Sequence, residues 1–212
     1  MNPVFVDTSV LIAAEDTGAQ ALYAACLAWL DALWQHRSGR TGNQALVEFY
    51  DQVVAAPQPM PRGDARAAMR RYQTWAPWKT DAATLETAWA IEARHALPFG
   101  DCLALACAQH SGCPAMLSVD LPHGAVYGGV QVLHPLRCTP QEFAEGSVKG
   151  AVNIPLDEVE SRLNEFKGKP SVIVFCRTGN RSGQAKAILE YNGIKNVTNG
   201  INTKTVNEEL AK

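Results

Sequence analysis

The chain has 212 residues, of which 47% are hydrophobic, and a formal net charge of −2 at pH 7. This length allows one large or two small domains, and the charge gives no sign of a nucleic-acid partner. No apolar run is long enough to span a membrane, and the N-terminus lacks the features of a signal peptide. The six cysteines form no CxxC pair, which predicts reduced thiols in a cytoplasmic protein.

The first part of the chain predicts strands that alternate with helices. Asp81 is a plausible N-cap, and Gly112 is expected to end a helix. Such an order predicts an α/β fold with a parallel sheet, whose ligands bind at the carboxyl ends of the strands. We expect strands at 4–6, 115–118 and 130–133, and helices at 19–36, 43–55, 62–75, 81–95 and 102–110.

The composition changes near residue 138. Lys79 is the only lysine before this point and seven follow it, whereas all five tryptophans and all five histidines precede it. A fusion of two sequences of different origin, natural or not, explains the change. We therefore predict two modules, 1–135 and 136–212.

The second module repeats the alternation on a smaller scale. The apolar run 171–175 predicts a buried strand, and the polar end, 201–212, predicts a less ordered segment. We further expect short helices at 141–145 and 157–166, a strand at 151–154 and a helix at 182–192.

Four carboxylates stand where a parallel sheet would bring them together. Asp7 ends the first strand, Asp120 follows a later one, and Asp101 opens a helix. Glu48 lies among apolar residues, where a lone charge is costly. Any one aspartate alone reads better as a helix cap or a turn residue. Together they predict a site for Mg²⁺, which prefers oxygen ligands and keeps waters, one of which can become a nucleophile.

These residues occur in motifs that resemble, in order, those of PIN domains, and of VapC-type toxins in particular. The resemblance implies an endoribonuclease that depends on Mg²⁺ or Mn²⁺ and is the toxin of a toxin–antitoxin pair. It further implies an RNA substrate, an antitoxin partner and a homodimer, with Ser118 orienting a ligand or water. Asp7, Glu48, Asp101 and Asp120 would hold the metal. The matching segments are 4–12, 44–50, 99–108 and 117–124.

Contact with RNA has weaker signals. Arg62, Arg66 and Arg70 fall on one helical face, with Arg71 beside them. This face is consistent with phosphate binding and equally with simple solvation. His123, close to Asp120, is either a substrate contact or a surface histidine without a role.

A second candidate site surrounds Cys176. This cysteine follows an apolar strand and precedes a helix, so loop N–H groups and the helix N-terminus favour its thiolate. Arg177 and Arg181 add positive charge for an anionic donor. A buried cysteine that merely ends a strand is the alternative interpretation.

The loop and the segment 142–156 resemble rhodanese sulfurtransferases. Cysteine phosphatases need an arginine where Ser182 stands. The resemblance covers 137–200 and implies that Cys176 accepts a sulfane sulfur as a persulfide and passes it to a thiol or cyanide. The module lacks the family's first strand and aspartate, and Ser147 replaces a histidine; 130–133 either supplies that strand or the strand is lost. The implied substrate-binding residues are Arg177, Thr178, Gly179, Asn180, Arg181 and Ser182.

Three hypotheses follow. The first is a ribonuclease toxin whose rhodanese-like tail has a minor function. The second is a sulfurtransferase with the PIN part as a scaffold. The third is a non-catalytic fusion that binds an antitoxin.

Overall fold

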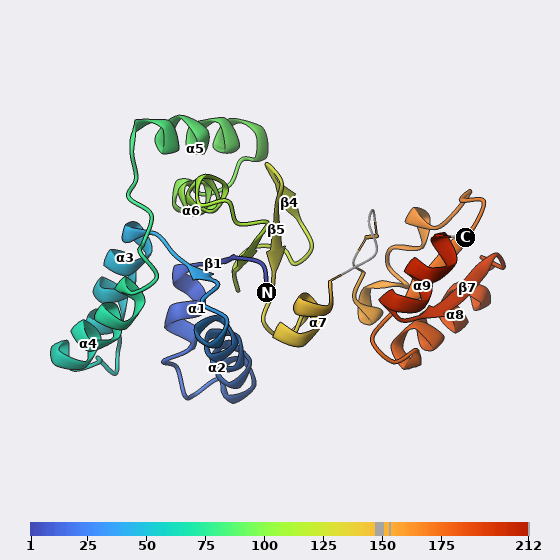
Figure 1. Cartoon of the computed structure of the whole chain (residues 1–212), viewed down its shortest axis with the longest axis horizontal. Helices are drawn as coiled ribbons and strands as arrows, with labels where there is room; N and C mark the ends of the chain where they lie inside the picture. Colours follow the sequence, from blue (N-terminus) through green and yellow to red (C-terminus); the bar gives the residue numbers. More distant parts are fainter. Residues whose placement is uncertain (147–150, 153, 212) are drawn as a thin grey trace. The chain divides into compact units, whose positions relative to one another are not determined.

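The computed structural model describes residues 1–146, 151–152 and 154–211 (Figure 1). The chain divides into two compact units, Met1–Pro140 and Gln141–Lys212. Ser147 and Asn153, on which two expectations fall, lie outside the described residues. None of the helices in the described ranges is both long and apolar enough to cross a membrane.

The first unit contains the predicted sheet. β1 (Val4–Val6), β3 (Ala115–Leu117) and β5 (Val130–Leu133) are parallel neighbours, with β2 (Gly39–Arg40) parallel to β1 at one edge. β4 (Val126–Tyr127) pairs with β5 antiparallel, so the strand order is β2-β1-β3-β5-β4. The α/β class with a mostly parallel sheet is confirmed. β2 and β4 were not predicted because two-residue strands are too short to show a hydrophobic period.

Helices lie on both sides of this sheet. Figure 1 shows α5 and α6 on one side, and α1 and α2 on the other. Asp81 is the N-cap of α5, because its side chain accepts the N–H of Thr84 at 2.8 Å. α6 begins three residues earlier than predicted, so Asp101 lies in its first turn. The helices are α1 (Thr8–Ala13), α2 (Gln20–Gln35), α3 (Asn43–Ala55), α4 (Arg62–Gln73), α5 (Ala82–His95) and α6 (Phe99–His110).

The second unit is a smaller α/β module. Its described strands, β6 (Val172–Phe175) and β7 (Val197–Ile201), form a parallel pair packed against α8 (Asn180–Tyr191). α7 (Pro140–Glu145) precedes them at the division between the units. Because β5 pairs with β3, it belongs to the first sheet and does not supply the missing strand of the second unit. The buried core consists of Val159, Val172, Ala185, Leu189, Ile194 and Val197.

Two expectations for the second unit are wrong. Of the segment predicted as a strand, the described residues Ala151, Val152 and Ile154 are not in a strand. The predicted helix 157–166 is instead two 3₁₀ turns, η1 (Leu156–Glu158) and η2 (Leu163–Glu165).

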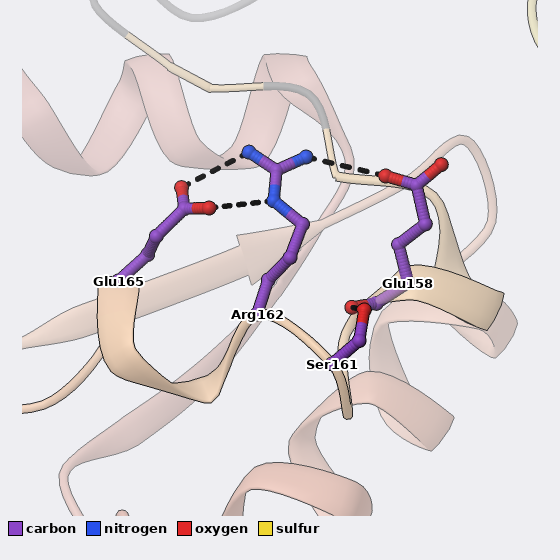
Figure 2. A network of polar contacts seen from close by, with 4 residues as sticks. All are labelled: Glu158, Ser161, Arg162 and Glu165. Carbon is purple, nitrogen blue, oxygen red and sulfur yellow. Dashed lines mark hydrogen bonds and ion pairs between the residues drawn. The ribbon is translucent and has the colours of Figure 1, made fainter.

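Local hydrogen bonds explain the 3₁₀ turns. The backbone closes i to i−3 bonds, including one from Glu165 N to Arg162 O at 3.0 Å, which tighten the chain. Figure 2 shows Arg162 between the two turns, with its Nε 2.6 Å from Glu165 and one terminal nitrogen 3.3 Å from Glu158. Ser161 donates to the carbonyl of Glu158 at 2.9 Å (Figure 2). Such side-chain pairs also form on continuous helices, so only the i to i−3 backbone bonds distinguish the two turns.

The polar C-terminal segment is also more regular than predicted. It forms α9 (Thr203–Leu210), whose N-cap Asn202 accepts the N–H of Thr205 at 2.9 Å. Val206 is buried and lies over the backbone of Gly200. A single buried apolar residue and a side-chain cap are a weak sequence signal, but they suffice to hold this helix on β7.

The packing of α9 gives a first testable prediction. A Cβ on Gly200 would lie 2.3 Å from Val206 Cγ2 and 3.0 Å from Ile173 Cγ2. We expect Gly200→Ala to destabilise the second unit by about 1–3 kcal/mol, the usual cost of overpacking. Urea denaturation followed by circular dichroism measures this. In Gly63→Ala, a control on α4 with open space around the new Cβ, we expect no loss of stability. An unchanged midpoint for Gly200→Ala would contradict the prediction.

Candidate functional site

The parallel register of β1 and β3 brings Asp7 next to Ser118. Val6 pairs with Leu117, so the following residues of both strands leave the sheet at the same edge. The N–H of Asp7 still donates to Leu117 O at 3.0 Å, which keeps the two chains together beyond the strands. Asp7 and Ser118 are both buried, and the Ser118 hydroxyl donates to Asp7 Oδ2 at 3.0 Å.

Two serines hold the Asp7 carboxylate. Ser9 Oγ donates to the same Oδ2 at 2.5 Å and accepts the N–H of Val119 at 3.2 Å. Ser118 Oγ in turn accepts the N–H groups of Asp120 and Leu121, each at 3.2 Å. The Asp7 carboxylate and the turn that carries Asp120 are therefore connected through Ser118, the residue predicted to orient a ligand.

Glu48 is held by a second pair of donors. Thr8 Oγ1 donates to Glu48 Oε2 at 2.7 Å, and Gln44 Nε2 donates to Oε1 at 2.5 Å. Gly100, at the start of α6, lies close by, because its Cβ position would be 4.0 Å from Glu48 Oε1. Sequence analysis did not assign roles to Thr8, Ser9 and Gln44. The signals available were their places beside Asp7 and one helical turn before Glu48.

Asp101 is the carboxylate that interacts with the other three. Burial raises the pKa of Asp101, and the negative charges of Asp120 and Glu48 raise it further. Burial also raises the pKa of Asp7; hydrogen bonds from Ser9 and Ser118 oppose this, and the charge of Asp101 adds to it. Carboxylates whose pKa is shifted by burial and by neighbouring charges often occur at functional sites.

The donor set fits a hard divalent cation in its chemistry. All four side chains offer carboxylate oxygens, which Mg²⁺ and Mn²⁺ prefer, and a cation would relieve their repulsion. Among the described residues, no three His, Cys, Asp or Glu side chains stand close enough to share one ion as they are placed. Asp101 and Asp120 are less buried than Asp7.

The buried charge of Asp7 lowers the stability of the fold at neutral pH. Its raised pKa in the fold means that the protonated form stabilises the protein, and that this stability is lost as the pH rises through the folded pKa. Asp7→Asn removes the buried charge, so we expect Tm at pH 7 to rise, by about 2–4 °C for each kcal/mol gained. The gain should shrink at acid pH, where Asp7 itself is protonated. Thermal denaturation of both proteins across pH tests this, and a Tm gain that does not depend on pH would contradict it.

The residues predicted to contact RNA lie on α4 and in the loop after Asp120, and their role remains a prediction. Arg62, Arg66 and Arg70 lie exposed on α4, and Arg71 forms an ion pair with Glu15 at 3.7 Å. His123 has a structural contact, because its Nδ1 accepts the backbone N–H of His134 at 3.0 Å. This bond attaches the loop after Asp120 to the end of β5.

The second unit places Cys176 at the end of β6, just before α8. The sulfur accepts the N–H of Gly179 at 3.2 Å and lies 3.4 Å from Ser182 Oγ. Gly179 has φ 86° and is the N-cap, so α8 begins at Asn180, two residues earlier than predicted. Burial opposes ionisation of Cys176, but hydrogen bonds from the Ser182 side chain and from the N–H groups of Ser182, Thr178 and Gly179 lower its pKa to about 7.

The other loop residues predicted to bind substrate are exposed or bonded to other side chains. Arg177 and Thr178 are exposed, and Asn180 Oδ1 accepts from Gln184 at 3.0 Å. Arg181 forms an ion pair with Glu142 on α7, so its charge is already partly balanced. Sequence analysis assigned no role to Asn199 on β7, which accepts from Ser182 Oγ at 2.8 Å. No sequence spacing indicated this contact, because it joins a helix to a strand seventeen residues away.

Two family models match the chain, one over each part. A PIN domain model matches residues 4–126, and a rhodanese-like domain model matches residues 132–202. The first match covers more than half of the chain, which therefore belongs to the PIN domain family and carries a rhodanese-like domain after it. Both predicted resemblances are confirmed. The rhodanese match begins inside β5, a strand that the structure places in the first sheet.

Curated relatives match the second part of the chain. Uncharacterized protein YqhL of Bacillus subtilis (strain 168) is 38% identical over 60 residues, covering 28% of this chain and 48% of YqhL. Thiosulfate sulfurtransferase PspE of Escherichia coli (strain K12) is 38% identical over 69 residues, covering 32% and 66%. Thiosulfate sulfurtransferase 16, chloroplastic, of Arabidopsis thaliana is 30% identical over 108 residues, covering 44% and 88%. The chain thus spans about half to two thirds of the length of the first two.

Solved structures similar to the chain include that of a bacterial toxin. The crystal structure of VapC20 of Mycobacterium tuberculosis, a toxin that cleaves the sarcin-ricin loop, has a TM-score of 0.43 and 22% identity. The match covers 53% of this chain and 86% of VapC20.

Proposed function

We propose that the first unit is a metal-dependent endoribonuclease. The observation that carries this proposal is a set of carboxylates held in place by hydroxyl donors: Ser9 and Ser118 bond Asp7 at the carboxyl edge of the sheet, and Thr8 bonds Glu48. The negative charges of Asp120 and Glu48 add to the rise in the pKa of Asp101. Membership of the PIN family supports the proposal. A PIN unit that only binds a partner has no need of carboxylates whose negative charges raise the pKa of Asp7 and Asp101.

In the proposed reaction, Asp7, Glu48, Asp101 and Asp120 would hold Mg²⁺ or Mn²⁺. A bound ion would supply activation of a water for attack on a phosphodiester and neutralisation of the developing charge. Ser9 and Ser118 keep the Asp7 carboxylate in place, and Thr8 and Gln44 do the same for Glu48. The exposed arginines of α4 would contact RNA phosphates.

The wider role belongs to the same proposal. The resemblance of the motifs to VapC-type toxins supports a toxin of a toxin–antitoxin pair, with an antitoxin protein as partner, a homodimer and a cytoplasmic location. A fusion that binds an antitoxin without catalysis is the alternative, and retained binding by a variant with both sites removed would support it.

The test is cleavage of a mixed RNA pool by the full chain. We expect products with Mg²⁺ or Mn²⁺ and none with EDTA, and activity should return when metal is added in excess of the chelator. Cleavage that persists in EDTA would refute the metal-dependent mechanism.

We propose sulfur transfer at Cys176 as a second activity. Its pKa of about 7 favours this, because a large fraction of the thiol is then a thiolate at neutral pH. The thiolate attacks the sulfane sulfur of thiosulfate, a Cys–S–S⁻ persulfide forms, and sulfite leaves with the electron pair of the broken S–S bond. Cyanide or a thiolate then takes the outer sulfur and restores the Cys176 thiolate. PspE, one of the similar proteins, is a thiosulfate sulfurtransferase by name.

A further inference from the structure

Ser182 lies between two acceptors in the second unit. Its Oγ is 3.4 Å from Cys176 Sγ and 2.8 Å from Asn199 Oδ1. A hydroxyl carries one hydrogen and cannot donate to both at once. When Cys176 is a neutral thiol, its S–H can donate to Ser182 Oγ while Ser182 donates to Asn199. When Cys176 is a thiolate, the sulfur is purely an acceptor, and the Ser182 hydrogen must turn towards it.

Asn199 is well placed to compete for that hydrogen. Its Oδ1 also accepts the N–H of Ile201 at 3.0 Å, and its Nδ2 donates to Gly179 O at 3.1 Å. These two bonds fix the amide orientation, so that the oxygen faces Ser182. Oδ1 keeps the Ile201 partner when Ser182 turns away, so the exchange costs a single hydrogen bond.

Asn199 is not needed to hold the loop itself. Gly179 O also accepts the N–H of Gly183 at 2.9 Å, and the N–H of Cys176 donates to Ile201 O at 3.0 Å. Both bonds would remain if the Asn199 side chain were removed. Ile201 is exposed, so water can take its freed N–H. Of the Asn199 contacts, we therefore expect only the loss of the one with Ser182 to change the hydrogen bonding of Cys176 Sγ.

We propose that Asn199 is a positioning residue that sets the nucleophilicity of Cys176 by sharing the Ser182 hydrogen with it. The inference rests on the proposed sulfurtransferase function and adds its regulation within the site. Once the sulfur atom of Cys176 becomes uncharged in the persulfide, the hydroxyl returns to Asn199. The Ser182 hydrogen thus follows the charge on Cys176 through the transfer cycle.

The test is the pKa of Cys176 in the full chain. The pH dependence of iodoacetamide labelling, quantified on the Cys176 peptide by mass spectrometry, reports this pKa without sulfur transfer. We expect Asn199→Ala to lower it by about half to one unit, since Ser182 then donates freely to the thiolate. Ser182→Ala should raise it, and adding Asn199→Ala to Ser182→Ala should change nothing further.

Comparison of wild type, the two single variants and the double variant distinguishes an effect through Ser182 from an effect on the loop structure. A rise of the pKa in Asn199→Ala, or an equal shift with and without Ser182, would overturn the proposal. If Asn199→Ala does not fold, Asn199→Asp serves instead, and its expected rise in pKa should be larger with Ser182 than without it. Asn196→Ala is the control, because Asn196 bonds Lys169 O, away from the loop. If the pKa shifts occur as predicted but wild type forms no thiocyanate, the sulfurtransferase function would be refuted and the role of Asn199 would stand.

Discussion

Asp101→Asn should lower metal-dependent RNA cleavage by about 100-fold or more, the scale of losing one preorganised charged group in an active site. The negative charge of Asp101 raises the pKa of Asp7, and the charges of Asp120 and Glu48 raise the pKa of Asp101. The replacement of Asp101 by a neutral amide of the same shape removes the negative charge of one proposed metal ligand with little change in packing. The measurement is the initial rate of RNA cleavage with Mg²⁺, beside wild type purified identically.

The matched control for this variant is Asp51→Asn. Asp51 is an exposed carboxylate on α3 of the same unit, and its loss changes the net charge equally. We expect its cleavage rate to stay near that of wild type. Equal RNA turnover by Asp101→Asn and wild type would point to a contaminating nuclease and refute the proposed site.

Cys176→Ser should abolish thiocyanate formation from thiosulfate and cyanide, because a serine hydroxyl cannot form a persulfide. The pH profile is measured on the first half-reaction, sulfite release from thiosulfate without cyanide, because hydrogen cyanide itself ionises in this pH range. For wild type we expect the rate of this release to rise with pH and to reach half its maximum near pH 7, the pKa of Cys176. The sign follows from the chemistry, since the thiolate is the nucleophile and it forms as the pH rises through the pKa. At pH 7 about half of the thiol would be ionised, against about 1% for an unperturbed pKa of 9.0.

A cysteine elsewhere in the chain serves as the control. Cys138 is partly exposed in the first unit, and Cys138→Ser should retain the wild-type rate and pH profile. A half-maximal rate of sulfite release near pH 9 in wild type would show that the hydrogen bonds to Cys176 do not lower its pKa. Thiocyanate formation by Cys176→Ser would show that another thiol performs the transfer.

The sequence by itself placed the candidate site residues relative to the strands and helices. Asp7 and Asp120 were placed from the apolar runs before them, because side chains that follow parallel strands reach the same edge. Cys176 was placed in the same way, between an apolar strand and a helix. Asp81 was a cap signal that the structure confirms. All of these are local patterns, in which a few consecutive residues specify both the element and its end.

The tertiary structure decided what surrounds those residues. Thr8 at Glu48 and Asn199 behind Ser182 are brought in by contacts between separate elements. Gln44 lies on the same helix as Glu48, one turn away. Nor could sequence assign 130–133 to the first sheet, since an apolar strand reads the same in either sheet and pairing with β3 settles it. A hydrophobic period records which face of a segment is buried but not against what, and the partners of each site depend on that choice.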